Sequence, residues 1–206
     1  MNITNKDYFT FNVHNSALVV GQTGTGKTEL VRSYMRRIEQ AFTPEEMKYV
    51  IFDLKQVEFD TEFDGGAKEE YLYTDIRFGT PEDMEYLEEL ATLAKDRAET
   101  EVTIPFLFIY IEECDLAVQY SERFEDAVFT INRYAQKANM KLIFSTSRVS
   151  KDIVTEELRD SFDVILAGTL ASDTDAEHLG VAFGTETKMH EFVVVENARN
   201  NECEDF

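Results

Sequence analysis

The sequence predicts an α/β fold with a mainly parallel central sheet flanked by helices. Three observations lead to this prediction. Short apolar runs alternate along the 206 residues with longer segments whose apolar residues recur at helical spacing. A glycine-rich loop stands between the first apolar run and the first helical segment. Hydrophobic residues make up 43% of the chain and aromatic residues 12%, which is enough for a buried core.

The first predicted elements surround the glycine-rich loop. Ala17–Val20 is expected to be a short buried strand, and a helix is expected from Lys27 to about Gln40. Thr43-Pro44 interrupts the helical pattern, and Tyr49–Phe52 is expected to form a second strand. One face of the helix is apolar, which favours its burial against the sheet. That face consists of Leu30, Val31, Tyr34, Met35 and Ile38.

The rest of the chain repeats the alternation after a charged, loop-like stretch at residues 54–70. A long helix is expected to run to about Thr100, with Thr80 as its N-cap and Pro81 at its first position. Its buried stripe is expected to contain Met84, Leu87, Leu90, Ala91 and Ala94. The apolar run Ile104–Ile111 is expected to be a buried strand, most hydrophobic from Phe106 onward. Further helices are expected at Phe124–Ala138 and Thr174–Leu179, and further strands at Leu142–Phe144, Val164–Ala167 and Phe192–Val195.

Length and composition favour one domain over residues 1–206, with a lead-in at 1–15 and an acidic, flexible tail at 197–206. No apolar run approaches the roughly 18 residues that a membrane helix needs, and the start of the chain lacks a signal-peptide pattern. Only Cys114 and Cys203 are present, so a disulfide framework is not indicated. We therefore expect a cytoplasmic protein without direct membrane insertion.

The formal net charge of −21 bears on the class of partner. Proteins that grip nucleic acid usually carry a basic surface. One interpretation is that Asp and Glu simply coat a soluble outer surface, since net charge says little about local arrangement. The other is that any contact with a polyanion is confined to a small basic area.

The glycine-rich loop, Gly21-x-x-x-x-Gly26-Lys27-Thr28, matches the P-loop pattern. Its backbone N–H groups and the start of the following helix are suited to hold phosphates. Lys27 is expected to bridge the β- and γ-phosphates of ATP, and the Thr28 hydroxyl to bind Mg²⁺. The alternative is a chance match, which the preceding strand and following helix disfavour. The nucleotide-binding candidates are Gly21, Gln22, Thr23, Gly24, Thr25, Gly26, Lys27 and Thr28.

Two carboxylates, Glu112 and Glu113, directly follow the most hydrophobic predicted strand. P-loop enzymes need acidic groups there to hold Mg²⁺ and to act on the attacking water. Glu112 is expected to contact Mg²⁺, through water, and Glu113 to be the catalytic base. Glu112 stands where Asp is usual, so its metal geometry differs by one methylene. An ordinary strand ending in an acidic turn is the alternative.

A third polar segment, Thr146-Ser147-Arg148, follows the predicted strand at Leu142–Phe144. We expect Thr146 and Ser147 to lie beside the γ-phosphate of the bound nucleotide, where they could report its hydrolysis. Strands often end in Ser/Thr turns, so this segment alone is a weak indicator of function.

Together these motifs resemble the motor domain of FtsK/SpoIIIE-type DNA translocases, within the FtsK–HerA superfamily of P-loop ring ATPases. The match runs from about Ser16 to Val195. Four departures accompany it: Leu54 replaces Pro, Glu112 replaces Asp, Ser147 replaces Gln, and the family's Gly-Arg-x-x-Gly stretch is not reproduced near 136–139. The matching segments are Ser16–Thr28, Asp53-x-Lys55-x-x-Glu58, Thr74-Asp75 with the helix ending near Arg97, Arg133–Ala138 and Ser145–Thr155.

The resemblance implies a three-layer, RecA-like P-loop NTPase fold and an ATPase that uses ATP and Mg²⁺. It implies a homo-oligomeric, hexameric ring that translocates double-stranded DNA, with a trans-acting arginine for which Arg133 and Arg148 are candidates. The membrane segments and the DNA-orienting winged-helix domain of full-length translocases are not in this sequence. We therefore expect a bare motor of a plasmid, phage or virus, brought to its task by an element-encoded recruiting protein and serving packaging, conjugation or replication.

Two other functions stay open. A type VII-like protein secretion ATPase would suit the acidic composition, since a DNA channel needs a basic lining. A nucleotide-dependent switch or adaptor with little turnover would suit the replacements at Glu112 and Ser147.

Overall fold

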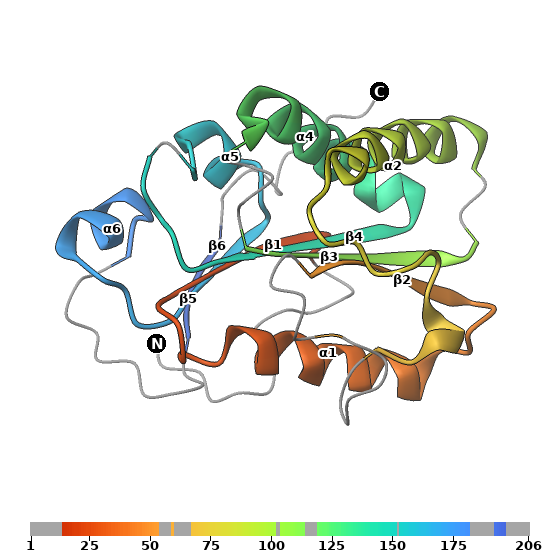
Figure 1. Ribbon diagram of the computed structural model, residues 1–206, viewed down its shortest axis with the longest axis horizontal. Helices are drawn as coiled ribbons and strands as arrows, with labels where there is room; N and C mark the ends of the chain where they lie inside the picture. The colour runs from red at the N-terminus through yellow and green to blue at the C-terminus, as the bar shows by residue number, and fades with distance from the viewer. Residues whose placement is uncertain are drawn as a thin grey trace.

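The computed structural model describes residues 14–53, 59, 67–101, 104–113, 119–151, 153–181 and 192–196. In these ranges six strands form one sheet: β1 (Ser16–Val20), β2 (Met47–Asp53), β3 (Phe106–Glu112), β4 (Met140–Thr146), β5 (Val164–Ala167) and β6 (Val193–Glu196). The strand order is β2-β3-β4-β1-β5-β6 (Figure 1). Every pairing is parallel except that of β5 with β6. The predicted mainly parallel sheet is therefore confirmed.

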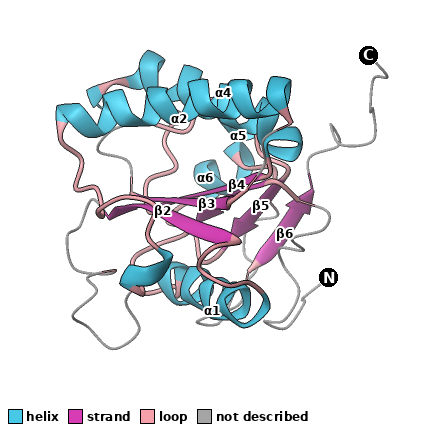
Figure 2. Ribbon diagram, turned by 90° about the vertical axis from the view of Figure 1, so that its right-hand side faces the viewer, coloured by secondary structure: helices cyan, strands magenta, loops and turns pink. Residues whose placement is uncertain are grey.

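Helices cover both faces of the sheet. Helix α1 (Lys27–Ala41) lies on one face, and α2 (Pro81–Thr100) and α4 (Ser121–Ala138) lie together on the other (Figure 2). Shorter helices complete the described chain: η1 (Glu69–Tyr71), α5 (Glu156–Asp160) and α6 (Asp173–His178). The result is the predicted three-layer α/β architecture.

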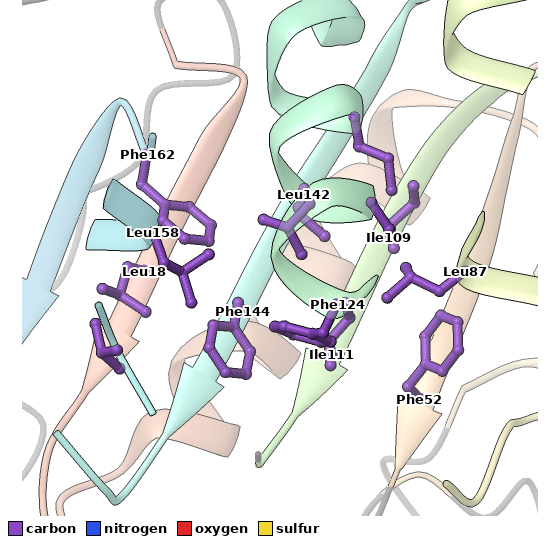
Figure 3. Close-up of a cluster of buried hydrophobic side chains, with 14 of the residues drawn as sticks. Leu18, Phe52, Leu87, Ile109, Ile111, Phe124, Leu142, Phe144, Leu158 and Phe162 are labelled. Carbon is purple, nitrogen blue, oxygen red and sulfur yellow. The ribbon is translucent and has the colours of Figure 1, made fainter. Parts of the chain in front are cut away.

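Each face of the sheet has its own hydrophobic core. On the α1 side, the apolar helix residues predicted from their spacing are buried beneath alternate residues of the strands. The Tyr49 hydroxyl crosses this layer to donate to the main-chain oxygen of Met35, at 2.9 Å. On the other side, the rings of Phe124, Phe144 and Phe162 join α4, β4 and the turn that precedes β5 (Figure 3). The sheet is thus buried on both faces, as a parallel sheet requires.

The start of α2 confirms the predicted cap. Thr80 has extended backbone angles and Pro81 is the first helical residue. The carboxylate of Asp83 accepts hydrogen bonds from the backbone N–H groups of Gly79 and Thr80, both at 2.8 Å. Asp83 therefore satisfies donors that the first turn of the helix leaves open. The predicted apolar stripe of α2 is buried as well.

The predicted elements differ from the observed ones mainly at their ends. Ile104 was expected within a buried strand but is 73% exposed, and the strand begins at Phe106, whose N–H donates to Glu46. The expectation for Ile104 was therefore wrong, because the apolar run begins before the ladder does. Helix α5 was not predicted, since its five residues are mostly charged and too short to show a periodic pattern. Within the stretch expected to be a loop, residues 69–71 form η1.

Some predictions fall on residues outside the described ranges. These include Lys55 and Glu58 of the FtsK-like segment, Cys114, Cys203, Asp152 and the tail at 197–206. None of the helices in the described ranges combines the length and apolar character that a membrane crossing requires.

Candidate functional site

The polar segments predicted to form the site meet at the carboxyl edge of the sheet. Val20, the last residue of β1, is paired with Thr146 at the end of β4. Glu112 at the end of β3 is paired with Ser145 on one side and with Asp53 on the other. Because these strands are parallel and adjacent, the segments that follow β1, β3 and β4 begin side by side.

The glycine-rich loop leads from β1 directly into α1. Gly26 is the N-cap of α1 and has a φ of +95°, a left-handed conformation that glycine adopts without strain. Thr25 is buried and closes the loop through two bonds to the Gln22 carbonyl, from its N–H at 3.2 Å and its hydroxyl at 2.9 Å. Gln22, Thr23 and Gly24 form the exposed tip. The loop therefore has the strand–loop–helix setting that phosphate binding needs.

Neighbouring strand ends fasten this loop in place. The Gly21 N–H donates to the Thr146 carbonyl at 3.3 Å, and the Gln22 N–H donates to the Thr169 carbonyl at 2.8 Å. A Cβ atom on Gly168 would lie 3.2 Å from the Thr25 Cβ, so glycine permits the close approach of the two loops. Sequence reasoning missed Gly168 and Thr169, although a glycine directly after the β5 strand was an available signal.

Lys27 is folded into the loop that precedes it. Its ammonium group donates to the carbonyl oxygens of Gly21, at 2.7 Å, and Gln22, at 3.3 Å, and the residue is 6% exposed. The positive charge therefore lies within the curve of the loop, where the phosphates of a nucleotide would be expected.

Thr28 and Glu112, the two predicted metal ligands, are in direct contact. The Thr28 hydroxyl donates to Glu112 Oε1 at 2.8 Å, and Glu112 is 1% exposed. A hydroxyl and a carboxylate are hard oxygen ligands of the kind that Mg²⁺ prefers alongside phosphate and water. The pair therefore fits a magnesium–nucleotide site. The described residues contain no cluster of three or more His, Cys, Asp or Glu side chains that could hold a metal by itself.

Glu113 is held by the end of β4. Its backbone has a φ of +64°, and its N–H donates to the Ser145 carbonyl at 2.7 Å. Its Oε2 atom accepts from the Ser147 hydroxyl at 3.0 Å and from the Ser147 N–H at 3.4 Å. Glu113 and Ser147 were predicted separately, and the structure joins them.

Three further buried side chains, Tyr110, Ser145 and Asp53, support the strand ends that carry the site. The hydroxyls of Tyr110 and Ser145 are hydrogen bonded at 2.8 Å between β3 and β4. Burial, followed by the nearby charge of Glu112, raises the pKa of Tyr110 well above its usual value, so this hydroxyl stays neutral. Asp53 at the end of β2 accepts from the Phe59 N–H at 3.0 Å. These contacts fix the ends of the strands that carry the acidic residues.

The two candidate arginines lie in different places. Arg148 is exposed and directly follows Ser147, and its N–H donates to the Thr146 hydroxyl at 3.0 Å. Arg133 is exposed on α4, with its guanidinium 5.7 Å from the centre of the Tyr134 ring. Helix α4 ends at Ala138, directly before β4 begins at the amino edge of the sheet. Arg148 therefore follows the end of β4, the strand next to β1, whereas Arg133 lies on α4 toward the opposite edge of the sheet.

Comparison with known proteins places this geometry among similar ones. No protein-family model matches the chain. A DNA translocase FtsK of Lactococcus lactis subsp. cremoris is 23% identical over 192 residues, covering 82% of this chain and 25% of the relative. A DNA translocase FtsK of Mycobacterium leprae is 25% identical over 189 residues, covering 77% of this chain and 22% of the relative. The chain thus spans about a quarter of the length of the curated relatives that it matches.

The fold is also similar to that of several solved structures. The pCW3 conjugation coupling protein TcpA with ATPγS has a TM-score of 0.74 at 14% identity, covering 92% of this chain and 59% of that one. ATPases 2 and 3 of EssC from Geobacillus thermodenitrificans give 0.69 at 14% identity, covering 91% and 38%. The genome packaging NTPase B204 of Sulfolobus turreted icosahedral virus 2 with AMP gives 0.59 at 16% identity, covering 92% and 95%. This chain therefore has a P-loop ATPase fold and resembles FtsK-type translocases, as its motifs predicted.

Proposed function

We propose that this chain is an ATPase motor that moves double-stranded DNA. The observation that carries the proposal is the joint position of Lys27, the Thr28–Glu112 pair and Glu113 at one edge of the sheet. A phosphate loop alone supports nucleotide binding only. A carboxylate beside its helix and a second one on the next residue supply the parts that hydrolysis of ATP needs.

In this mechanism the loop binds the phosphates through its N–H groups, and the Lys27 ammonium transfers its hydrogen bonds from loop carbonyls to phosphate oxygens. Thr28 and Glu112 would hold Mg²⁺, which neutralises charge on the β- and γ-phosphates when bound. Glu113 accepts a proton from water as the water oxygen bonds to the γ-phosphorus. The bond from that phosphorus to the bridging oxygen breaks, and its electrons leave with ADP.

The names of the relatives support a proposal for the assembly and the cargo. FtsK is named a DNA translocase, TcpA a conjugation coupling protein and B204 a genome packaging NTPase. We propose that this chain forms a single motor domain that assembles into a homohexameric ring around DNA for a mobile element, with a recruiting protein of that element. Arg148 or Arg133 would complete the site of a neighbouring subunit. Arg133 is suited to contact outside its own subunit because it is exposed and distant from its own loop.

A second candidate is a protein secretion ATPase. Its support is the net charge of −21 together with the fold shared with EssC and with the type VII secretion ATPase EccC of Thermomonospora curvata. A third candidate, a switch with little turnover, is supported by the bonds that occupy Glu112 and Glu113 within the protein.

One experiment separates these candidates. ATP hydrolysis is measured at low salt with and without double-stranded DNA, and the mass of the protein is measured with and without nucleotide. A DNA motor is expected to hydrolyse ATP faster with DNA, because electrostatic binding to DNA is strongest at low salt. An ATP hydrolysis rate that is the same with and without DNA contradicts the DNA motor and favours the secretion ATPase. Tight ATP binding with almost no turnover under both conditions identifies the switch.

A further inference from the structure

The hydrogen bond between Ser147 and Glu113 carries an inference about how the catalytic base is controlled. Both residues follow the ends of adjacent parallel strands, where the Glu113 N–H continues the ladder by donating to Ser145 at 2.7 Å. The Ser147 hydroxyl then reaches Glu113 Oε2 at 3.0 Å, while its backbone N–H adds a longer contact of 3.4 Å. The hydroxyl is thus the shorter of the two contacts from Ser147 to this carboxylate.

The neighbouring carboxylate is held quite differently. Glu112 is 1% exposed and accepts from Thr28 on α1, whereas the half-buried Glu113 turns toward the end of β4. The left-handed backbone of Glu113, at φ +64°, separates the two directions. Two adjacent residues of one strand end therefore have separate supports, one from the phosphate loop's helix and one from Ser147.

The chemistry of the hydroxyl limits what Ser147 can do at one time. A serine hydroxyl has one proton to donate, and both a carboxylate and a phosphate are acceptors. While that proton is donated to Glu113, it is not available to the γ-phosphate. The adjacent Thr146 hydroxyl is likewise donated to a protein acceptor, the Arg148 carbonyl at 3.1 Å.

We propose that Ser147 is a positioning residue for Glu113, a role that rests on the proposed ATP hydrolysis. A glutamate side chain has several rotatable bonds, and a general base acts well only when it is held close to the proton it accepts. The Ser147 hydroxyl selects one orientation of the carboxylate before ATP arrives.

The test compares Ser147→Ala with Ser147→Thr, which keeps a hydroxyl, in assays of ATP hydrolysis. Ser147→Ala is expected to lower kcat about tenfold, equivalent to about 1.4 kcal/mol, with KM changed less than about twofold. Ser147→Thr is expected to restore most of kcat. Ser150→Ala, an exposed serine on the same segment, is the matched control.

A double variant distinguishes positioning of Glu113 from contact with phosphate. In a Glu113→Gln background, Ser147→Ala is expected to lower kcat by less than about twofold further, since the group it positions is already gone. A full tenfold loss in that background, or a raised KM with unchanged kcat, would overturn the proposal. If the unaltered chain neither binds nor hydrolyses ATP, the proposed function itself fails. If the unaltered chain hydrolyses ATP and the Ser147→Ala variant has the same kcat, only the role of Ser147 fails.

Discussion

The two edges of the sheet are built from the same strands but handle polar groups in opposite ways. At the amino edge, Asp163 Oδ2 accepts from the N–H groups of Asn15, at 2.6 Å, and Ser16, at 3.2 Å, and the Asp163 N–H donates to Ser16 Oγ. Lys141 donates to the carbonyl of His14 and the side chain of Asn15, both at 2.7 Å. These polar groups are hydrogen bonded to one another at the starts of β1, β4 and β5.

At the carboxyl edge the contacts are of a kind that a ligand can replace. The Lys27 ammonium donates to loop carbonyls, and Glu112 and Glu113 each accept from a hydroxyl. A phosphate is a stronger acceptor for an ammonium group than a carbonyl is. The polar groups of the amino edge therefore stabilise the fold, whereas those of the carboxyl edge can exchange their contacts for contacts with a charged ligand.

The largest expected effect is that of Lys27→Ala, at the carboxyl edge, on ATP turnover. Loss of the ammonium group should lower ATP turnover by about 10³-fold, because it removes charge stabilisation from the phosphates. The free energy of unfolding should change much less than turnover does, by about 1–2 kcal/mol, because two hydrogen bonds to loop carbonyls are lost. Turnover assays and denaturant unfolding measure the two effects, with the exposed Lys95→Ala on α2 as control. Retained turnover would refute the assignment of the loop as a phosphate site.

A smaller loss, about 10²-fold in kcat, is expected from Glu113→Gln, because the amide cannot accept the proton of the attacking water. Binding of a non-hydrolysable ATP analogue should change by less than about threefold, since the substitution keeps the shape of the side chain. Single-turnover kinetics and calorimetry check these outcomes beside Glu99→Gln, an exposed position on α2. Unchanged kcat would show that another group is the base.

The amino edge should respond in stability rather than in activity. Asp163→Ala removes the acceptor of two backbone N–H groups and a charge near Lys141, so unfolding should become easier by about 2–3 kcal/mol. Turnover should stay within about twofold of the unaltered chain when measured well below the unfolding temperature. Denaturant unfolding of this variant is compared with that of Asp126→Ala, an exposed site on α4. A large loss of turnover with unchanged stability would reverse the roles of the two edges.

The smallest effect concerns pH. Burial lowers the pKa of Lys141 from 10.5 to about 8, a shift only partly opposed by Asp163. Between about pH 8 and 10.5 the unfolded chain then holds more protons at this residue than the folded chain, so this group makes stability rise with pH. Below about pH 8 both states are charged and the burial penalty is present in full.

Lys141→Met tests this sign, because methionine keeps the length of the side chain without a titrating group. The stability of the variant relative to the unaltered chain should therefore decline as pH rises from 8 to 10.5, as measured by denaturant unfolding at several pH values. A difference that stays constant over this range would contradict the pKa shift. Lys95→Met, at an exposed position, should show no such trend.

The sequence predicted much of the fold because local patterns record burial. Apolar spacing located the buried faces of α1 and α2, and the residues around Thr80 located the start of a helix. It was less accurate where tertiary contacts decide. Strand β4 extends beyond Leu142–Phe144 at both ends because its neighbours β3 and β1 extend the ladder. Ile104 was misassigned because hydrophobicity alone does not reveal where pairing starts.

The candidate site shows the same division. The pattern around Lys27 predicts the loop, since its chemistry is encoded in consecutive residues. The contact of Ser147 with Glu113 joins residues 34 positions apart and depends on the order of the strands. Periodicity carries no information on that order. The contact of Gly168 with Thr25 depends likewise on β5 being the neighbour of β1.

The close contact between Gly168 and Thr25 has a consequence for the entropy of nucleotide binding. With the loop hydrogen bonded to Thr146 and Thr169, and with a Cβ at residue 168 only 3.2 Å from the Thr25 Cβ, few alternative loop shapes remain accessible. A loop already confined in this way loses little conformational entropy when phosphates arrive. Gly168→Val would crowd this contact and should therefore alter the entropy of nucleotide binding, even though residue 168 lies outside the phosphate loop.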